Sequence, residues 1–134
     1  MVEVIREVLT EFKRGDFYVG DQIPQKKIAN ATAALKIDSA ARVVGLIDVT
    51  LFGSCDEGMA FCESGIYWRT ALSDTASGFI DWPTLVDMRG KIFSDEKLVY
   101  FGTRGSFNPA GSKLSSTYVA RTIIELTARL KPFC

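Results

Sequence analysis

The sequence contains no histidine among its 134 residues. This absence removes the commonest general base, the commonest metal ligand and the usual serine or cysteine triads at the same time. An enzyme built on this chain would have to use carboxylates, lysine, cysteine or tyrosine instead. The composition therefore favours a non-catalytic protein, and we expect no metal site and no other cofactor.

The sequence also lacks an excess of charge, since 16 basic and 16 acidic residues cancel. A chain that neutralises nucleic-acid phosphates, or that lies on an anionic lipid surface, usually carries a basic excess. Nucleic acid is therefore not expected as a partner. A transmembrane segment is not expected either, because no stretch approaches the roughly 20 consecutive apolar residues that a membrane-spanning helix requires.

Cysteine is scarce, and the three cysteines Cys55, Cys62 and Cys134 form an odd set without C-x-x-C spacing. Free thiols in a reducing cytoplasm are the simplest interpretation, and a Cys55–Cys62 bridge is the alternative. The N-terminal residues carry acidic groups early and no small-residue cleavage site, so they do not resemble a signal peptide. We therefore expect a cytoplasmic protein.

Hydrophobic residues make up 47% of the chain, and their spacing near the N-terminus predicts two helices. An apolar stripe between Val4 and Phe12 predicts the first helix, over residues 2–14. Pro24 suits the first turn of a second helix, because its missing N–H has no partner at that position anyway. The second helix is expected to end around residues 36–38.

In the middle of the chain the hydrophobic period changes to two, which predicts β-strands. The predicted strands cover 43–51, 59–62, 66–69, 78–82, 91–93 and 98–102, with a further short strand around 106–107 and a loop over 71–78. A stripe from Val119 to Leu130 predicts a closing helix, capped by Ser115 or Ser116. Strands segregated from helices predict an α+β fold, with residues 1–134 in one domain.

The stretch from Asp48 to Trp68 contains three short apolar runs separated by the turn clusters GSCDEG and ESG, as in an antiparallel β-meander. Its motifs are IDVTLFG at 47–53, DEG at 56–58, the apolar run 59–61 and GIYW at 65–68, followed by GFIDW at 78–82. Together with the closing helix, this pattern resembles the bacterial pleckstrin-homology-like (PH-like) domains. The resemblance covers roughly residues 40–131, and the helical extension over 1–38 is similar to one that precedes some of these domains.

The resemblance implies a partly open antiparallel β-barrel of about six to seven strands, with a C-terminal capping helix and two N-terminal helices. PH-like domains bind phosphoinositides, peptides or other proteins. In members that bind phosphoinositides, the loop between the first two strands is basic. Here that loop contains Asp56 and Glu57 and no lysine or arginine, so it would repel an anionic head group. We therefore do not expect phosphoinositide binding.

Aromatic residues concentrate in two of the predicted strands, as Tyr67, Trp68, Phe79 and Trp82. Strand alternation sends Tyr67 and Trp68 to opposite faces, so some of these rings must point away from the barrel interior. They either pack under the N-terminal helices or form a surface for a partner or for self-association. These four residues are the candidate interaction surface.

Two other groups of residues offer alternative sites. The glycine-rich segment 102–113 carries Arg104 and Lys113, which could hold an anion together with backbone amides, although a plain turn region explains the same composition. Asp48 and Asp81, with Tyr67, could serve as an acid–base set, although purely structural roles are the simpler explanation. Asp48 is expected on the wetter face of its strand.

The predicted function is that of a non-catalytic protein-interaction or self-assembly module of the PH-like type. The first alternative is a protein that binds a small anionic or apolar ligand. The second is a histidine-free enzyme that uses its carboxylates, which requires Asp48 and Asp81 to lie close together.

Overall fold

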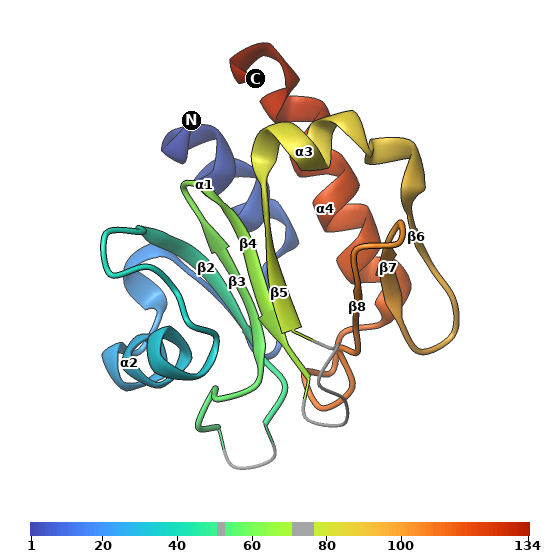
Figure 1. The fold of residues 1–134 in the computed structure, drawn as a ribbon. Coiled ribbons are helices and arrows are strands. Elements are labelled where there is room, and N and C mark those ends of the chain that lie inside the picture. Colours follow the sequence, from blue (N-terminus) through green and yellow to red (C-terminus); the bar gives the residue numbers. More distant parts are fainter. Residues whose placement is uncertain (51–52, 71–76) are drawn as a thin grey trace.

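A computed structural model of the protein describes residues 1–50, 53–70 and 77–134. The helices and strands follow one another along the chain as Figure 1 shows. Their order is α1 (Val2–Phe12), β1 (Phe17–Val19), the 3-10 turn η1 (Gly20–Gln22), α2 (Gln25–Ala34), β2 (Val43–Asp48), β3 (Gly58–Cys62), β4 (Gly65–Arg69), β5 (Ser77–Asp81), α3 (Trp82–Asp87), η2 (Arg89–Lys91), β6 (Ile92–Ser94), β7 (Val99–Phe101), β8 (Ser106–Phe107), α4 (Ser116–Leu130) and η3 (Lys131–Phe133). None of these helices is both long enough and apolar enough to cross a membrane.

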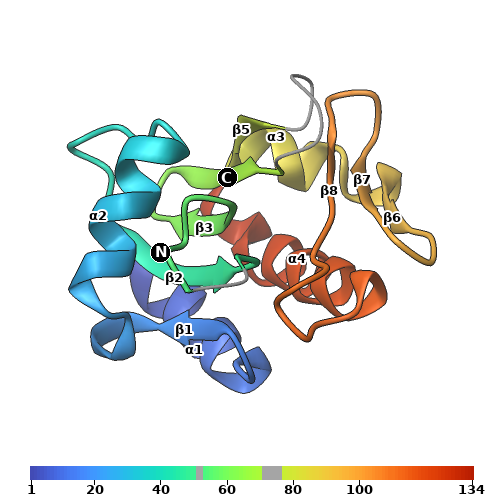
Figure 2. The same ribbon diagram turned by 90° about the horizontal axis from the view of Figure 1, so that it is seen from below.

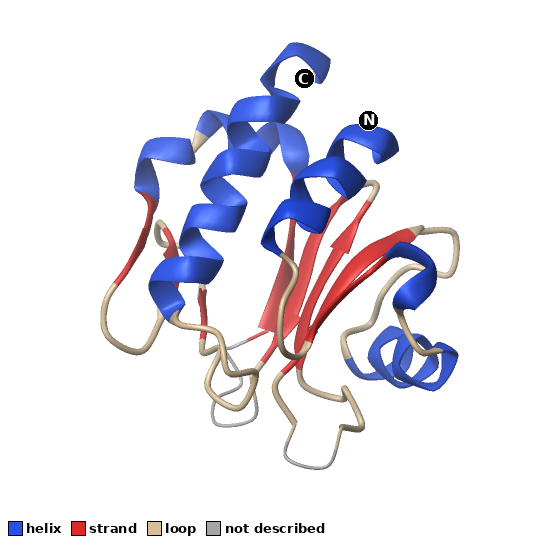
Figure 3. Cartoon of the chain, turned by 180° about the vertical axis from the view of Figure 1, so that it is seen from behind, coloured by secondary structure: helices blue, strands red, loops and turns tan. Residues whose placement is uncertain are grey.

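The main sheet has five antiparallel strands in the order β1-β2-β3-β4-β5. Helices cover both of its faces: α1 and α4 lie side by side on one face and α2 lies on the other (Figure 3). The core on the α1–α4 side contains Leu9, Ile47 and Trp68, among others. The smaller core under α2 contains Leu46 and Tyr67. Alternate residues of β1 to β4 therefore point into two separate cores, whereas β5 contributes Ile80 to the core on the α1–α4 side alone.

A second sheet has three antiparallel strands in the order β6-β7-β8. It lies on the opposite side of the molecule from α2 (Figure 2). The Trp68 side chain lies between the two sheets, because the glycines at 78 in β5 and 105 before β8 both pack against its indole ring. Among the residues that the structure describes, no backbone ladder joins the two sheets.

The structure confirms the predicted α+β class with antiparallel sheets and a C-terminal helix. The predicted barrel is not confirmed, because the strands of the described residues form two sheets that do not join. The Ser115 side chain accepts a hydrogen bond from the Tyr118 amide and caps α4, as one of the two predicted caps. The strand β8 also occurs where the residue pattern indicated it. The predicted loop over 71–78 lies largely outside the described residues.

Two predictions about secondary structure need correction. Residues 1–38 are not purely helical, because β1 pairs with β2 and forms an edge of the main sheet. The strand predicted over 43–51 ends at Asp48, while residues 51–52 lie outside the described part. Asp48 turns the chain out of the strand, since its side chain accepts a hydrogen bond from the Thr50 amide.

Candidate functional site

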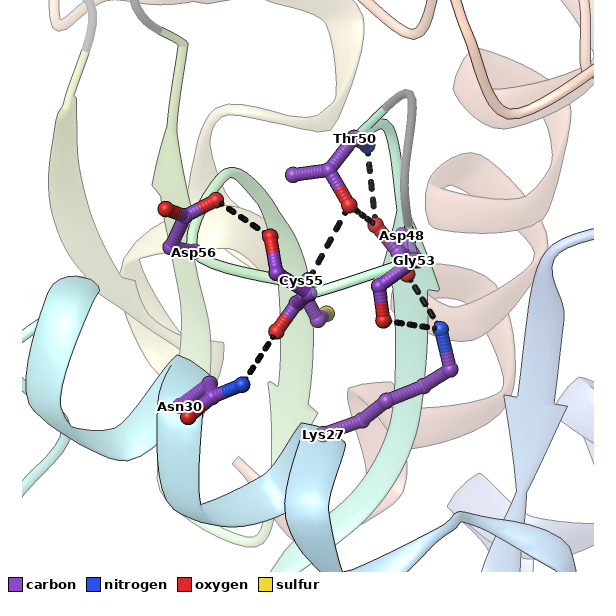
Figure 4. A network of polar contacts seen from close by, with 8 residues as sticks. Lys27, Asn30, Asp48, Thr50, Gly53, Cys55 and Asp56 are labelled. Carbon is purple, nitrogen blue, oxygen red and sulfur yellow. Dashed lines mark hydrogen bonds and ion pairs between the residues drawn. The ribbon is translucent and has the colours of Figure 1, made fainter.

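The densest polar cluster in the described residues joins α2 to the end of β2 (Figure 4). Lys27 Nζ donates hydrogen bonds to Asp48 Oδ2 at 2.5 Å and to the Gly53 carbonyl oxygen at 2.7 Å. The Asp48 side chain is 2% exposed and that of Lys27 is 14% exposed. Because a buried carboxylate is costly unless it is paired, this contact accounts for the position of Asp48. We call this cluster the Lys27–Asp48 network.

The other oxygen of Asp48 organises the loop that follows. Asp48 Oδ1 accepts hydrogen bonds from the Thr50 amide at 2.8 Å and from Thr50 Oγ1 at 2.5 Å. Thr50 Oγ1 in turn accepts a hydrogen bond from the Cys55 amide at 3.1 Å. From α2, Asn30 Nδ2 donates to the Ser54 carbonyl oxygen at 2.8 Å. Residues 50 and 53–55, which follow β2, are therefore held by side chains of both α2 and β2.

The pKa values of the ion pair support a permanent charge on both groups. Burial raises the pKa of Asp48, but the hydrogen bonds from Lys27 and Thr50 and the Lys27 charge outweigh it, so the pKa is lowered overall. Burial lowers the pKa of Lys27, and the hydrogen bond and charge of Asp48 outweigh it in the same way, so this pKa is raised. Neither group is poised to exchange a proton near neutral pH.

The two cysteines next to this network are poor nucleophiles. Cys55 and Cys62 are free and fully buried in the core under α2. Burial raises the pKa of each thiol to about 12. Since the thiolate is the reactive form, neither cysteine is suited to act as a nucleophile. The Lys27–Asp48 network therefore has the properties of a structural contact and not of a thiol-based active site.

Asp48 and Asp81 do not form an acid–base pair. Asp48 lies opposite Gly58, and the same row continues to Ser77 in β5, whereas Asp81 lies opposite Gly65 at the other end of the strands. The four residue steps from 77 to 81 separate the two rows by about 13 Å along the strands, and the carboxylates also stand three strands apart. Asp81 instead caps α3, where its side chain accepts a hydrogen bond from the Thr84 amide.

The predicted aromatic surface is only partly present. Trp68 and Trp82 are each 1% exposed and belong to the core, so the expectation that they form a docking surface is wrong. Trp68 packs against Phe101 of β7, with ring centroids 4.7 Å apart, and Trp82 is the first residue of α3. Trp82 Nε1 also donates a hydrogen bond to the Cys62 carbonyl oxygen at 2.9 Å.

The other two aromatic residues remain together at the border of the α2 layer. Tyr67 and Phe79 lie directly opposite each other on β4 and β5, with ring centroids 4.4 Å apart. Tyr67 is 9% exposed because it belongs to the core under α2, whereas Phe79 is 39% exposed. Helix α2 therefore covers the sheet as far as β4 and leaves the Phe79 side chain on β5 in contact with solvent.

The contacts of the described residues do not bring Arg104 and Lys113 together. Arg104 lies in the turn before β8, where its amide donates a hydrogen bond to the Phe101 carbonyl oxygen. Lys113 follows β8 and has a left-handed backbone conformation, with a φ of 66°. Both are exposed, and no hydrogen bond or ion pair among the described residues brings their side chains to one group.

Sequence reasoning missed two residues that the structure brings forward, Phe93 and Lys27. Phe93, on β6, is 54% exposed and stacks on Tyr100 with ring centroids 4.8 Å apart. The period-two pattern of its strand was the only available signal. Lys27 was also missed, since nothing in a run of polar helix residues marks which lysine will meet a carboxylate 21 positions away.

Comparison with known proteins gives no match: no protein family, no curated protein and no solved structure is similar enough to the chain to be reported.

Proposed function

We propose that the chain is a non-catalytic self-assembly module of the PH-like type in the cytoplasm, and that two copies associate through β5. The observation that carries this proposal is the exposed Phe79 side chain on an edge strand of the main sheet. In the described part of the chain, β5 has β4 as its only ladder partner. An edge strand with unpaired backbone groups is a template for pairing with another strand.

The residues of β5 suit pairing with a second copy of themselves. An antiparallel pair centred on Phe79 places this ring beside Phe79 of the second copy, and Tyr67 extends the aromatic row on both sides. The same register places Ser77 opposite Asp81 of the second copy, where the serine hydroxyl can donate to the carboxylate. Arg69 on β4 lies opposite Ser77 of the same chain, and it adds a cation to that row. The contact is thus self-complementary, as a two-fold interface must be.

We also propose that the fold is of the PH-like type. The motif pattern between residues 47 and 82 supports it, as do the antiparallel meander and the C-terminal helix, which packs on the smaller sheet.

The experiment is to measure molar mass by light scattering from about 10 µM to about 1 mM, because a single edge-strand contact gives a small and weak interface. We expect the mass to rise from that of a monomer toward that of a dimer. Phe79→Asp places a charge in the centre of the contact and should keep the protein monomeric throughout. A native circular dichroism spectrum establishes that this variant folds.

Phe93→Asp is the matched control, because Phe93 is also an exposed aromatic residue of an edge strand but belongs to the other sheet. This variant should associate like the unmodified protein. A protein that stays monomeric at every concentration contradicts the proposal. So does association that Phe93→Asp abolishes and Phe79→Asp leaves intact, because the contact would then lie on the small sheet.

A further inference from the structure

A cavity of about 410 Å³ lies beside the end of β1. Its origin is the shortness of that strand: β1 pairs with β2 only from Phe17 to Val19, and Val19 lies opposite Gly45. Gly20, with a φ of 60°, then turns the chain away into η1. Val43 and Val44 of β2 therefore extend past β1 and form one wall of the cavity.

Two arginines from distant parts of the sequence line this cavity, Arg6 from α1 and Arg42 from the segment before β2. Arg6 Nε is buried and has no hydrogen-bond partner among the described residues. The one ion pair of Arg6 joins Nη1 to Glu3 at 3.5 Å, and the Glu3 side chain is 77% exposed, so this pair is weak. In the described part of the chain, no hydrogen bond or ion pair engages the Arg42 side chain. Guanidinium groups are thus left with free donors.

The remaining lining limits what these donors can bind. Asp21 is the only acidic residue of the lining, so two cations face one carboxylate and leave a net charge of +1. A single negative charge balances this lining better than the two charges of a phosphate. Ile23 and Ile28 add apolar wall to that of Val43 and Val44. A guanidinium fork matches the two oxygens of a carboxylate.

We infer that this cavity binds a small organic carboxylate with an apolar body, with Arg6 and Arg42 on the carboxylate and the isoleucine and valine side chains around the body. Such a group occurs both in free carboxylic acids and at the C-terminus of a peptide. The site is independent of the β5 contact, because it lies at the other edge of the main sheet.

The test uses two carboxylate probes and their neutral amides. Hexanoate represents a free acid, and N-acetyl-alanyl-leucine represents a peptide C-terminus. Titration followed by NMR of the ¹⁵N-labelled protein should give saturable shifts at the amides of residues 20–23 and 42–44 with at least one of these acids. Hexanamide and the amidated peptide have the same body without the charge, and they should give no saturable shift at these positions.

Binding by hexanoate alone assigns the site to free acids, and binding by the peptide alone assigns it to chain termini. Arg42→Gln should weaken the affinity for the binding acid about tenfold or more, since a charge-assisted hydrogen-bond pair is lost. Arg6→Lys keeps the charge but removes the fork and Nε, so it should also weaken binding. Arg121→Gln changes an exposed arginine of α4 outside the cavity and should bind like the unmodified protein.

The inference is overturned if neither acid gives saturable shifts, or if the neutral amides bind as well as the acids. It is also overturned if Arg42→Gln binds with unchanged affinity. The comparison of acid with amide uses the unmodified protein, so it decides the question even if a variant does not fold.

Discussion

Lys27 Nζ lies 2.5 Å from Asp48 Oδ2, so a helix outside the main sheet supplies the counter-charge for a carboxylate that the sheet buries. The same lysine also holds the Gly53 carbonyl oxygen. One side chain of α2 therefore connects the end of β2 with the loop that follows it. The packing of α2 on the sheet and the path of this loop depend on each other.

Replacing Lys27 by methionine should destabilise the protein by about 3 kcal/mol, the low end of the range for a broken buried ion pair, because Lys27 keeps some contact with solvent. The reason is that the Asp48 carboxylate stays buried without its partner. Urea denaturation of the purified variant measures the change in the free energy of unfolding.

Lys26→Met is the control for that substitution, because Lys26 is the exposed neighbour in the same helix. It should change the free energy of unfolding by no more than about 0.5 kcal/mol. Equal effects of the two substitutions would show that the Lys27–Asp48 contact does not contribute specifically to stability.

The ion pair also predicts a dependence of stability on pH. The pKa of Asp48 is lowered by folding, so its contribution is complete above the unfolded carboxyl pKa of about 4 and is lost as the pH falls through the folded value. The pKa of Lys27 is raised, so its contribution is lost only as the pH rises above about 10.

Asp48→Asn removes the acidic part of this dependence. The variant should be less stable than the unmodified protein at pH 7, and the difference should narrow as the pH falls below about 4. Urea midpoints measured from neutral to acidic pH test this expectation. A difference that stays constant over the whole range would contradict the assigned pKa shift of Asp48.

The cysteines should differ sharply in reactivity toward a thiol reagent. Cys134 is exposed, whereas Cys55 and Cys62 are buried and each has a pKa raised to about 12 by that burial. We expect iodoacetamide at neutral pH to modify Cys134 alone in the native protein and all three cysteines in denaturant. Peptide mass spectrometry identifies the modified sites. Rapid native labelling of Cys55 would show that the loop after β2 opens more readily than its hydrogen bonds indicate.

The contact of Trp68 with both sheets makes Gly78 sensitive to a single methyl group. A Cβ atom at Gly78 would lie 2.9 Å from Cζ2 of the Trp68 indole, which is 1% exposed and enclosed by the core. Gly78→Ala should therefore cost about 1–3 kcal/mol of stability through overpacking. Urea denaturation, followed by tryptophan fluorescence, measures the loss.

Gly90→Ala is the matched control, because no atom lies within 4 Å of the Cβ that it would add. It should be neutral, or stabilising by about 0.4–1 kcal/mol through the unfolded state. If Gly78→Ala behaves in the same way, the Trp68 ring has room to move and the two sheets are less tightly packed than the contacts indicate.

Much of the secondary structure could be predicted because its signals are local. The closing helix follows from the apolar stripe between Val119 and Leu130 and from the Ser115 cap, and the meander strands follow from period-two patterns between turns. The strand β1 was missed because three residues are too few to show a period. Its place in the sheet depends on pairing with β2, almost thirty positions further along the chain.

The candidate sites were harder to predict, because alternation along a strand separates residues into two sets without saying what covers each set. Tyr67 and Trp68 lie on opposite faces, as expected, but a helix layer covers both faces. For the same reason Asp48, which was expected on a wet face, is buried under Lys27. The exposure of Phe79 follows only from where α2 ends relative to β5.

The α+β class, the antiparallel meander, the capped closing helix and the absence of histidine chemistry could all be read from the sequence, because each depends on composition or on neighbours a few residues apart. The three-dimensional packing was needed to show that Lys27 pairs with Asp48, that Trp68 packs against the glycines at 78 and 105, and that Arg6 and Arg42 line one cavity. These contacts join residues from distant segments, and they arise from how helices and sheets pack, which no local pattern records.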